Sequence, residues 1–117
     1  MKNNDLKIVS MLEQALFSHP WEEEMFAYEL HDNPYAKLYV WEEEDEICGY
    51  IDYWITFERA QLANLAVRRD KQRQGIAKAM MEAMIQACER AMCENITLEV
   101  RMDNHEALAL YEHYGFL

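Results

Sequence analysis

The sequence predicts a single α/β domain, residues 1–117, in which a mixed, mostly antiparallel sheet is flanked by helices. Three observations support this. The chain has 117 residues, about one domain's worth, and 51% of them are hydrophobic. Segments rich in β-branched and aromatic residues alternate with segments of helical periodicity. The second half of the chain reads strand, helix, strand, which predicts a right-handed parallel βαβ unit.

Two helices are expected before the first strand. Residues 5–17 place apolar side chains at close to helical spacing. Pro20 suits the start of a second helix, and the glutamates after it lie in the first turn, where the helix dipole favours anions. This second helix should end near Leu30, because the residue before Pro34 disfavours helical backbone.

The rest of the chain predicts four strands and two helices. The acidic run between the first two strands is typical of a solvated hairpin connection. Gly115 suits the end of the last helix. The expected elements are strands at 36–41, 47–57 and 61–67, a helix at 75–91, a strand at 95–100 and a helix at 104–114.

Charge and composition exclude several classes of function. The formal net charge of −11 argues against binding nucleic acid or an anionic membrane, and it permits a basic protein or peptide as partner. No apolar run is long enough to span a bilayer, and the N-terminal residues lack a secretory signal. The three cysteines indicate free thiols in a reducing cytoplasm. Neither the cysteines nor the four histidines have metal-ligand spacing, so no metal is expected.

The segment 72–77, QRQGIA, lies where a strand leads into the clearest helix. A helix start presents unpaired N–H groups and the positive end of the dipole, so an anion such as a phosphate fits there. Gly75 would let the phosphate approach the backbone. An ordinary turn with exposed basic residues is the alternative, and neither a Walker loop nor a dinucleotide fingerprint is present. The cations around the segment are Arg68, Arg69, Lys71, Arg73 and Lys78.

These residues resemble a known family. Gln72-x-x-Gly75-x-Ala77 resembles the acetyl-coenzyme A signature of the GNAT acetyltransferases. The stretches NLAVRRDKQRQGIAKAMMEAMI and ITLEVRMDNHEALALYEHYGF resemble the bacterial ribosomal-protein-alanine N-acetyltransferases, and FSHPWEEEMF resembles their substrate-side helical segment. The resemblance covers residues 5–117 and implies the GNAT fold, with acetyl-CoA as co-substrate.

The resemblance also implies where acetyl-CoA binds. Backbone groups of Leu65, Ala66 and Val67 match the strand that holds the pantetheine arm. Asn104 matches an asparagine that bonds the same arm, although it would also serve as a helix N-cap. The residues that match the pyrophosphate loop are Arg73, Gln74, Gly75, Ile76, Ala77 and Lys78.

Two residues match the family's catalytic pair. Glu99 matches the general base: an N-terminal amine, with a reference pKa near 8, must lose a proton before it attacks the thioester. Strand alternation supports this role, although Glu99 could instead be an exposed strand residue or half of an ion pair. Tyr111 matches the general acid that protonates the departing thiolate. It could instead be a buried aromatic, and Tyr114 competes for the assignment on local spacing.

The expected activity is transfer of acetyl from acetyl-CoA to the N-terminal α-amine of a protein, favouring a ribosomal-protein alanine, by direct attack in a ternary complex. Two alternatives are a CoA-binding or protein-interaction module without turnover and a small-amine acetyltransferase. The family pattern has a strand before residue 5 and a C-terminal hairpin, which the sequence lacks. We therefore expect a domain incomplete at both ends, whose sheet was trimmed, lost strands, or is completed by a second copy in a homo-oligomer.

Overall fold

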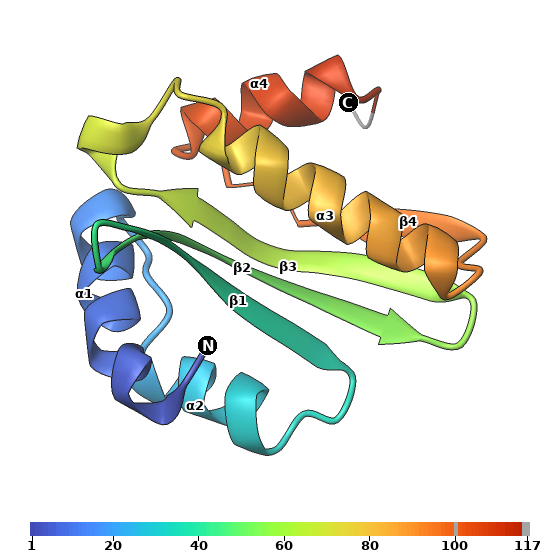
Figure 1. The fold of residues 1–117 in the computed structure, drawn as a ribbon, viewed down its shortest axis with the longest axis horizontal. Coiled ribbons are helices and arrows are strands. Elements are labelled where there is room, and N and C mark those ends of the chain that lie inside the picture. The colour runs from blue at the N-terminus through green and yellow to red at the C-terminus, as the bar shows by residue number, and fades with distance from the viewer. Residues whose placement is uncertain (100, 116–117) are drawn as a thin grey trace.

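Two helices packed against each other precede the sheet (Figure 1). The structure is a computed structural model that describes residues 1–99 and 101–115. After a short 3₁₀ turn, η1 (Asn3–Asp5), the helices are α1 (Leu6–Leu16) and α2 (Glu23–His31). Both predicted helices are confirmed. The second begins later than expected, because Glu22 is still extended, with φ −82° and ψ 161°.

The sheet has four described strands in the order β1-β2-β3-β4. The first three strands pair antiparallel, and β4 pairs parallel to β3, so the predicted mixed sheet and βαβ unit are confirmed. β4 is shorter than predicted, and Val100 lies outside the described residues. The strands are β1 (Ala36–Glu43), β2 (Glu46–Thr56), β3 (Arg59–Val67) and β4 (Asn95–Leu98).

The remaining helices follow the last two strands. After β3, a 3₁₀ turn, η2 (Arg69–Lys71), leads into α3 (Ile76–Arg90), and α4 (His105–His113) follows β4. Both α-helices lie within one residue of their predicted bounds at each end. None of the described helices is long and apolar enough to cross a bilayer. The described residues include no group of three or more histidine, cysteine, aspartate or glutamate side chains placed to hold a metal ion.

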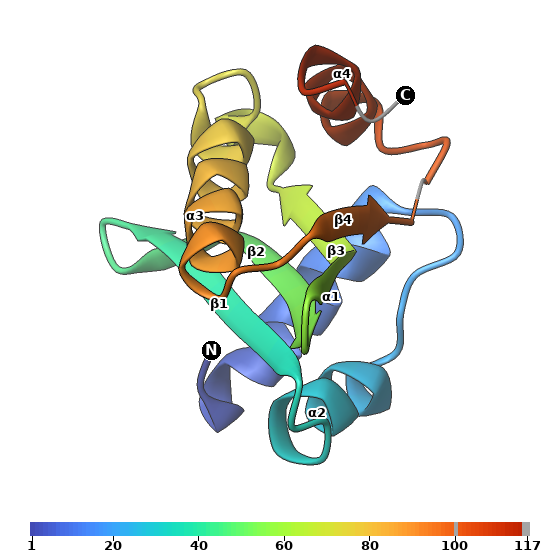
Figure 2. The ribbon, with the colours of Figure 1, turned by 90° about the vertical axis from the view of Figure 1, so that its right-hand side faces the viewer.

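The helices cover opposite faces of the sheet (Figure 2). Successive side chains of a strand point to opposite faces. Accordingly, Tyr50 of β2 packs with α1 and α2, whereas Ile51 packs with α3 and α4. The methionines of α3 lie in this second core, as expected of flexible gap-filling side chains.

A bulge in β3 marks the point where the sheet opens. Asp52 opposes Asn64 and Tyr53 opposes Leu62, so Ala63 is an extra residue without a partner on β2. The β3–β4 register also ends at Leu62. Beyond this point β3 continues without β4 beside it (Figure 2). A small pocket, which we call the gap, lies there between β3, the residues after β4 and α4.

Candidate active site

The gap beyond the bulge brings together residues from three segments. It is lined by β3, by the residues that follow β4, and by one face of α4. Four of the predicted site residues meet here, although they span almost fifty positions of sequence. The lining residues are Ala63, Asn64, Leu65, Glu99, Arg101, Asn104, Ala107 and Tyr111.

Glu99 lies at the mouth of this gap. Ile96 and Leu98 are half-buried against the core, whereas Thr97 and Glu99 are exposed, so the predicted alternation is confirmed for these residues. The Glu99 N–H donates to the Leu62 carbonyl at 3.3 Å, which fixes the backbone at the point where the strands part. Glu99 also lines a second pocket, and its Oε1 accepts a hydrogen bond from Gln61 Nε2 at 3.5 Å.

Tyr111 and Tyr114 are separated by the geometry of α4. Tyr111 is 4% exposed and lines the gap. Burial raises its pKa to about 12, opposed by the positive charge of Arg101, so its hydroxyl keeps its proton at neutral pH. The Tyr114 hydroxyl instead donates to Glu82 of α3. Of these two tyrosines, Tyr111 is therefore the one that lines the gap together with Glu99.

Exchanging each tyrosine for phenylalanine tests this separation. We expect Tyr111→Phe to lower kcat by about 10²-fold, because a positioned proton donor contributes at least that much. Tyr114→Phe should leave kcat near the wild-type value and cost about 1 kcal/mol of stability through its lost hydrogen bond. Steady-state kinetics and thermal unfolding of both variants measure this. An equal loss of kcat in the two variants would contradict the assignment of Tyr111.

Asn104 joins α4 to β3. Its Oδ1 accepts the N–H of Ala107 at 3.2 Å, which caps the helix, and its Nδ2 donates to the Leu65 carbonyl at 2.8 Å. Both ends of the side chain are therefore used, and the predicted N-cap is confirmed. The Leu65 carbonyl lies on the edge predicted to hold the pantetheine arm, so Asn104 stands where that arm would run.

The edge of β3 that faces the gap is formed by alternate residues. The Leu65 and Val67 carbonyls point into it, since they accept bonds from Asn104 and from Gln72 Nε2, the latter at 2.9 Å. Ala66 instead faces β2 in the register with Tyr50. Because N–H and C=O of one residue share a side of the strand, Leu65 and Val67 can offer both groups to an extended ligand.

The loop before α3 has the backbone of an anion site. Gly75 is the N-cap in the left-handed region, with φ +83°, which favours glycine. No side chain caps the start of α3 within the described residues, so its first N–H groups remain available to a ligand. Ile76 and Ala77 are buried, so only their backbone can contact an anion, whereas Lys78 is exposed.

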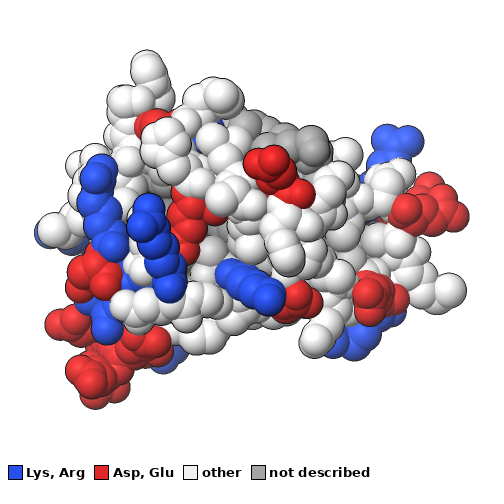
Figure 3. All heavy atoms as spheres, turned by 90° about the horizontal axis from the view of Figure 1, so that it is seen from above, with Lys and Arg blue, Asp and Glu red and all other residues white. Residues whose placement is uncertain are grey.

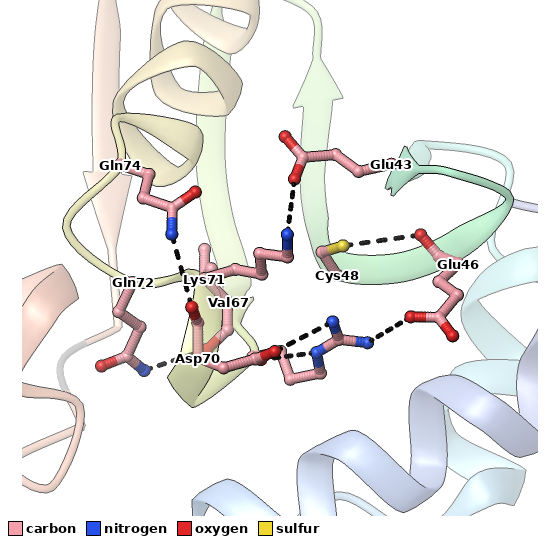
Figure 4. Close-up of polar contacts among 9 residues, drawn as sticks. Glu43, Glu46, Cys48, Val67, Asp70, Lys71, Gln72 and Gln74 are labelled. Carbon is pink, nitrogen blue, oxygen red and sulfur yellow. Dashed lines mark hydrogen bonds and ion pairs between the residues drawn. The ribbon is translucent and has the colours of Figure 1, made fainter.

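Part of the positive charge at this loop is neutralised by the acidic run (Figure 4). Lys71 pairs with Glu43 at 3.3 Å, and Arg68 pairs with Glu46 at 3.3 Å and with Asp70 at 2.6 Å. Glu43 ends β1 and Glu46 begins β2, so the expected solvated turn also supplies two ion-pair partners to the loop.

The other basic residues of the loop remain exposed. Arg69, Arg73 and Lys78 form no ion pair within the part of the chain that the structure describes. Figure 3 shows basic side chains gathered at the end of the molecule that carries this loop, beside a group of acidic ones. A cleft of about 480 Å³ runs from this end toward the gap, lined among others by Val67, Gln72, Asn104 and Glu106.

A second pocket, which we call the acceptor pocket, lies on the α2 side of Glu99. Its volume is about 430 Å³, and aromatic and acidic side chains line it. Sequence reasoning placed only the segment FSHPWEEEMF on the substrate side and missed Trp54 and Glu29, which come from β2 and the end of α2. The lining residues are Trp21, Glu24, Met25, Tyr28, Glu29, Trp54, Ala63 and Glu99.

Glu13 of α1 was also missed, although it contacts one residue of the gap, Arg101, and one of the acceptor pocket, Trp21. This carboxylate is fully buried. Its Oε2 lies 2.6 Å from Arg101 Nη2, which lines the gap, and accepts the Trp21 N–H at 2.8 Å. A glutamate at a core position of an amphipathic helix is a signal that could have found it, because buried charges are almost always paired.

The comparisons with known proteins agree with this geometry. The model of the Acetyltransferase (GNAT) family matches residues 6–116, so the chain belongs to that family. It is an acetyl-CoA-dependent N-acetyltransferase. The predicted family resemblance and enzyme class are thereby confirmed.

Among individual proteins, the chain is similar to alanine N-acetyltransferases of ribosomal protein bS18. The putative enzyme of Bacillus subtilis is 31% identical over 115 residues, covering 98% of this chain and 76% of that protein. The Escherichia coli enzyme is 31% identical over 116 residues, covering 99% of this chain and 77% of that protein. A crystal structure of the ribosomal-protein-S18-alanine N-acetyltransferase from E. coli superposes with a TM-score of 0.85 at 30% identity, covering 98% of this chain and 73% of that chain.

Proposed function

We propose that this protein acetylates the N-terminal α-amine of a protein, with an N-terminal alanine of a ribosomal protein as the favoured acceptor. The observation that carries the proposal is that Glu99 lines both the acceptor pocket and the gap. A base shared by the two pockets can take the proton of an amine held in the first before that amine attacks a thioester at the second. The similarity to the bS18-alanine N-acetyltransferases supports the choice of acceptor.

Acetyl-CoA would bind along the open edge of β3. Leu65 and Val67 supply backbone groups to the pantetheine arm, with Ala66 between them in the cleft wall. The pyrophosphate lies at the start of α3, held by the N–H groups from Gly75 to Lys78 and by the exposed cations. The Arg73 N–H would join them by leaving Glu106, whose Oε1 accepts it at 3.2 Å. Asn104 Nδ2, now bonded to the Leu65 carbonyl, is a side-chain donor for the arm.

The transfer is direct, in a ternary complex. Glu99 takes the proton of the acceptor amine, whose reference pKa is near 8. The amine attacks the thioester carbon beside Glu99, at the mouth of the gap, whose own volume is only about 20 Å³. The Tyr111 hydroxyl protonates the departing thiolate. The three glutamates of the acceptor pocket and the net charge of −11 favour a cationic amine on a basic chain.

Mass spectrometry of peptides incubated with labelled acetyl-CoA tests the proposal. We expect label on the α-amine of a basic peptide that begins with alanine. The same peptide with a blocked N-terminus and a free lysine should stay unlabelled. Label on lysine or on a small amine alone would overturn the choice of acceptor. Thermal stabilisation by acetyl-CoA without any labelled product would instead favour a binding module.

A further inference from the structure

Arg101 has an unusual set of contacts for a residue beside the gap. It follows Glu99 by two positions and lines the gap with Tyr111. Its Nη2 pairs with Glu13 Oε2 at 2.6 Å, and its guanidinium lies 4.2 Å from the ring centre of Phe17. Its Nη1 is buried and has no hydrogen-bond partner within residues 1–99 and 101–115.

Glu13 cannot supply the missing acceptor by turning. Its Oε1 accepts the Tyr50 hydroxyl at 2.7 Å and Asn64 Nδ2 at 3.0 Å, and its Oε2 accepts the Trp21 N–H besides Arg101. Four donors from four segments therefore hold this carboxylate, which in turn fixes the guanidinium. A buried charged donor without an acceptor costs free energy. Such a donor is expected where an acceptor arrives with a ligand.

We propose that Arg101 is a catalytic residue, and that its Nη1 donates a hydrogen bond to the acetyl carbonyl oxygen during transfer. The inference rests on the proposed placement of the thioester at the mouth of the gap. Arg101 lines this gap together with Glu99 and Tyr111, the proposed base and acid. A preorganised donor at a developing oxyanion is among the larger contributions an enzyme can make.

Glu99 takes one proton from the acceptor ammonium and passes it to solvent. The amine lone pair forms the C–N bond, and the electron pair of the C=O bond moves to oxygen, which Arg101 stabilises. The oxyanion then reforms C=O, the C–S bond breaks, and sulfur takes the proton of Tyr111. The second proton of the attacking nitrogen returns through water to Tyr111, so both residues end in their starting states. Arg101 keeps its protons throughout, since a guanidinium does not deprotonate in proteins.

Arg101→Lys tests the role without unpairing Glu13. The lysine ammonium can still pair with the Glu13 carboxylate, but it has no second nitrogen in the place of Nη1. We expect kcat to fall about 10²- to 10³-fold. The KM values and the affinity for acetyl-CoA should stay close to wild type, which a merely structural role would not preserve. Arg59→Lys, at the exposed start of β3, is the matched control and should leave kcat unchanged.

A folded Arg101→Lys protein that keeps kcat within a few-fold of wild type overturns the proposal. If that variant does not fold, Glu13→Gln combined with Arg101→Gln replaces the ion pair by two amides, and the same criteria apply. The assay can use any acceptor that the wild type acetylates, because the carbonyl chemistry is common to all of them. A wild type that acetylates a small amine but no peptide therefore overturns the acceptor alone. A wild type that acetylates nothing overturns both proposals.

Discussion

Glu99→Gln is expected to lower kcat by about 10²- to 10⁴-fold at pH 7, the usual contribution of a positioned general base. The amide keeps the size of the side chain and the exposed position after β4, but it cannot accept the amine proton. The affinity for acetyl-CoA should stay near wild type, because the residues proposed to bind it lie on β3 and at the start of α3. Initial rates and a binding titration measure both quantities.

The pH dependence of the rate distinguishes a Glu99→Gln variant that has lost its base from one whose site is distorted. A free α-amine has a reference pKa near 8, so at pH 9 most acceptors arrive without the proton. At pH 9 the kcat of the Glu99→Gln variant should therefore lie closer to the wild-type kcat than it does at pH 7. Glu94→Gln, on the exposed loop just before β4, is a control that should match wild type at both pH values. A Glu99→Gln enzyme with an unchanged rate would rule Glu99 out as the base.

The sequence predicted the elements well because their patterns are local. The alternation around Glu99 and the helical spacing of α3 appear within a few residues of chain. Tyr111 and Tyr114 could not be separated in this way, since residues three apart on a helix are neighbours on its surface. Tertiary contacts separate them: Tyr111 lines the gap, whereas Tyr114 donates to Glu82 on α3.

The residues missed by sequence reasoning depend on contacts between distant segments. The bulge at Ala63 leaves no trace in composition, yet it opens the gap. Glu13 stands out as a glutamate at a core position of α1, but its partner Arg101 lies far along the chain, and only the fold places the two side by side. The acidic run was likewise predicted to be a solvated turn from its charge alone. Its ion pairs with the loop before α3, through Glu43 and Glu46, could not be seen in the sequence.

Asp52 of β2 is the second place where a large effect is expected, here on stability. It is 1% exposed, and within the described residues neither carboxylate oxygen has a hydrogen-bond donor. Burial, reinforced by the nearby negative charge of Glu29, raises the pKa of Asp52 to about 9. Asp52 therefore keeps its proton in the folded protein at neutral pH.

The direction of the pH effect follows from this shift. The unfolded chain loses the Asp52 proton near pH 4, whereas the folded protein keeps it to about pH 9. The stability that this group contributes is therefore complete below pH 4 and declines as pH rises toward 9. Between those limits the decline is at most about 1.4 kcal/mol per pH unit.

Asp52→Asn should remove this dependence, because the amide never ionises. We expect the variant to exceed wild type in unfolding free energy by about 1–3 kcal/mol at pH 8, the cost of a buried group without partners. The advantage should shrink toward pH 5. Urea unfolding at several pH values measures it, with Asp32→Asn, exposed after α2, as a control that keeps the wild-type dependence. A constant difference across the range would mean that Asp52 ionises alike in both states. An ionised Asp52 would then add a second negative charge near Glu29, which lines the acceptor pocket. That charge would strengthen the attraction of the pocket for a cationic amine.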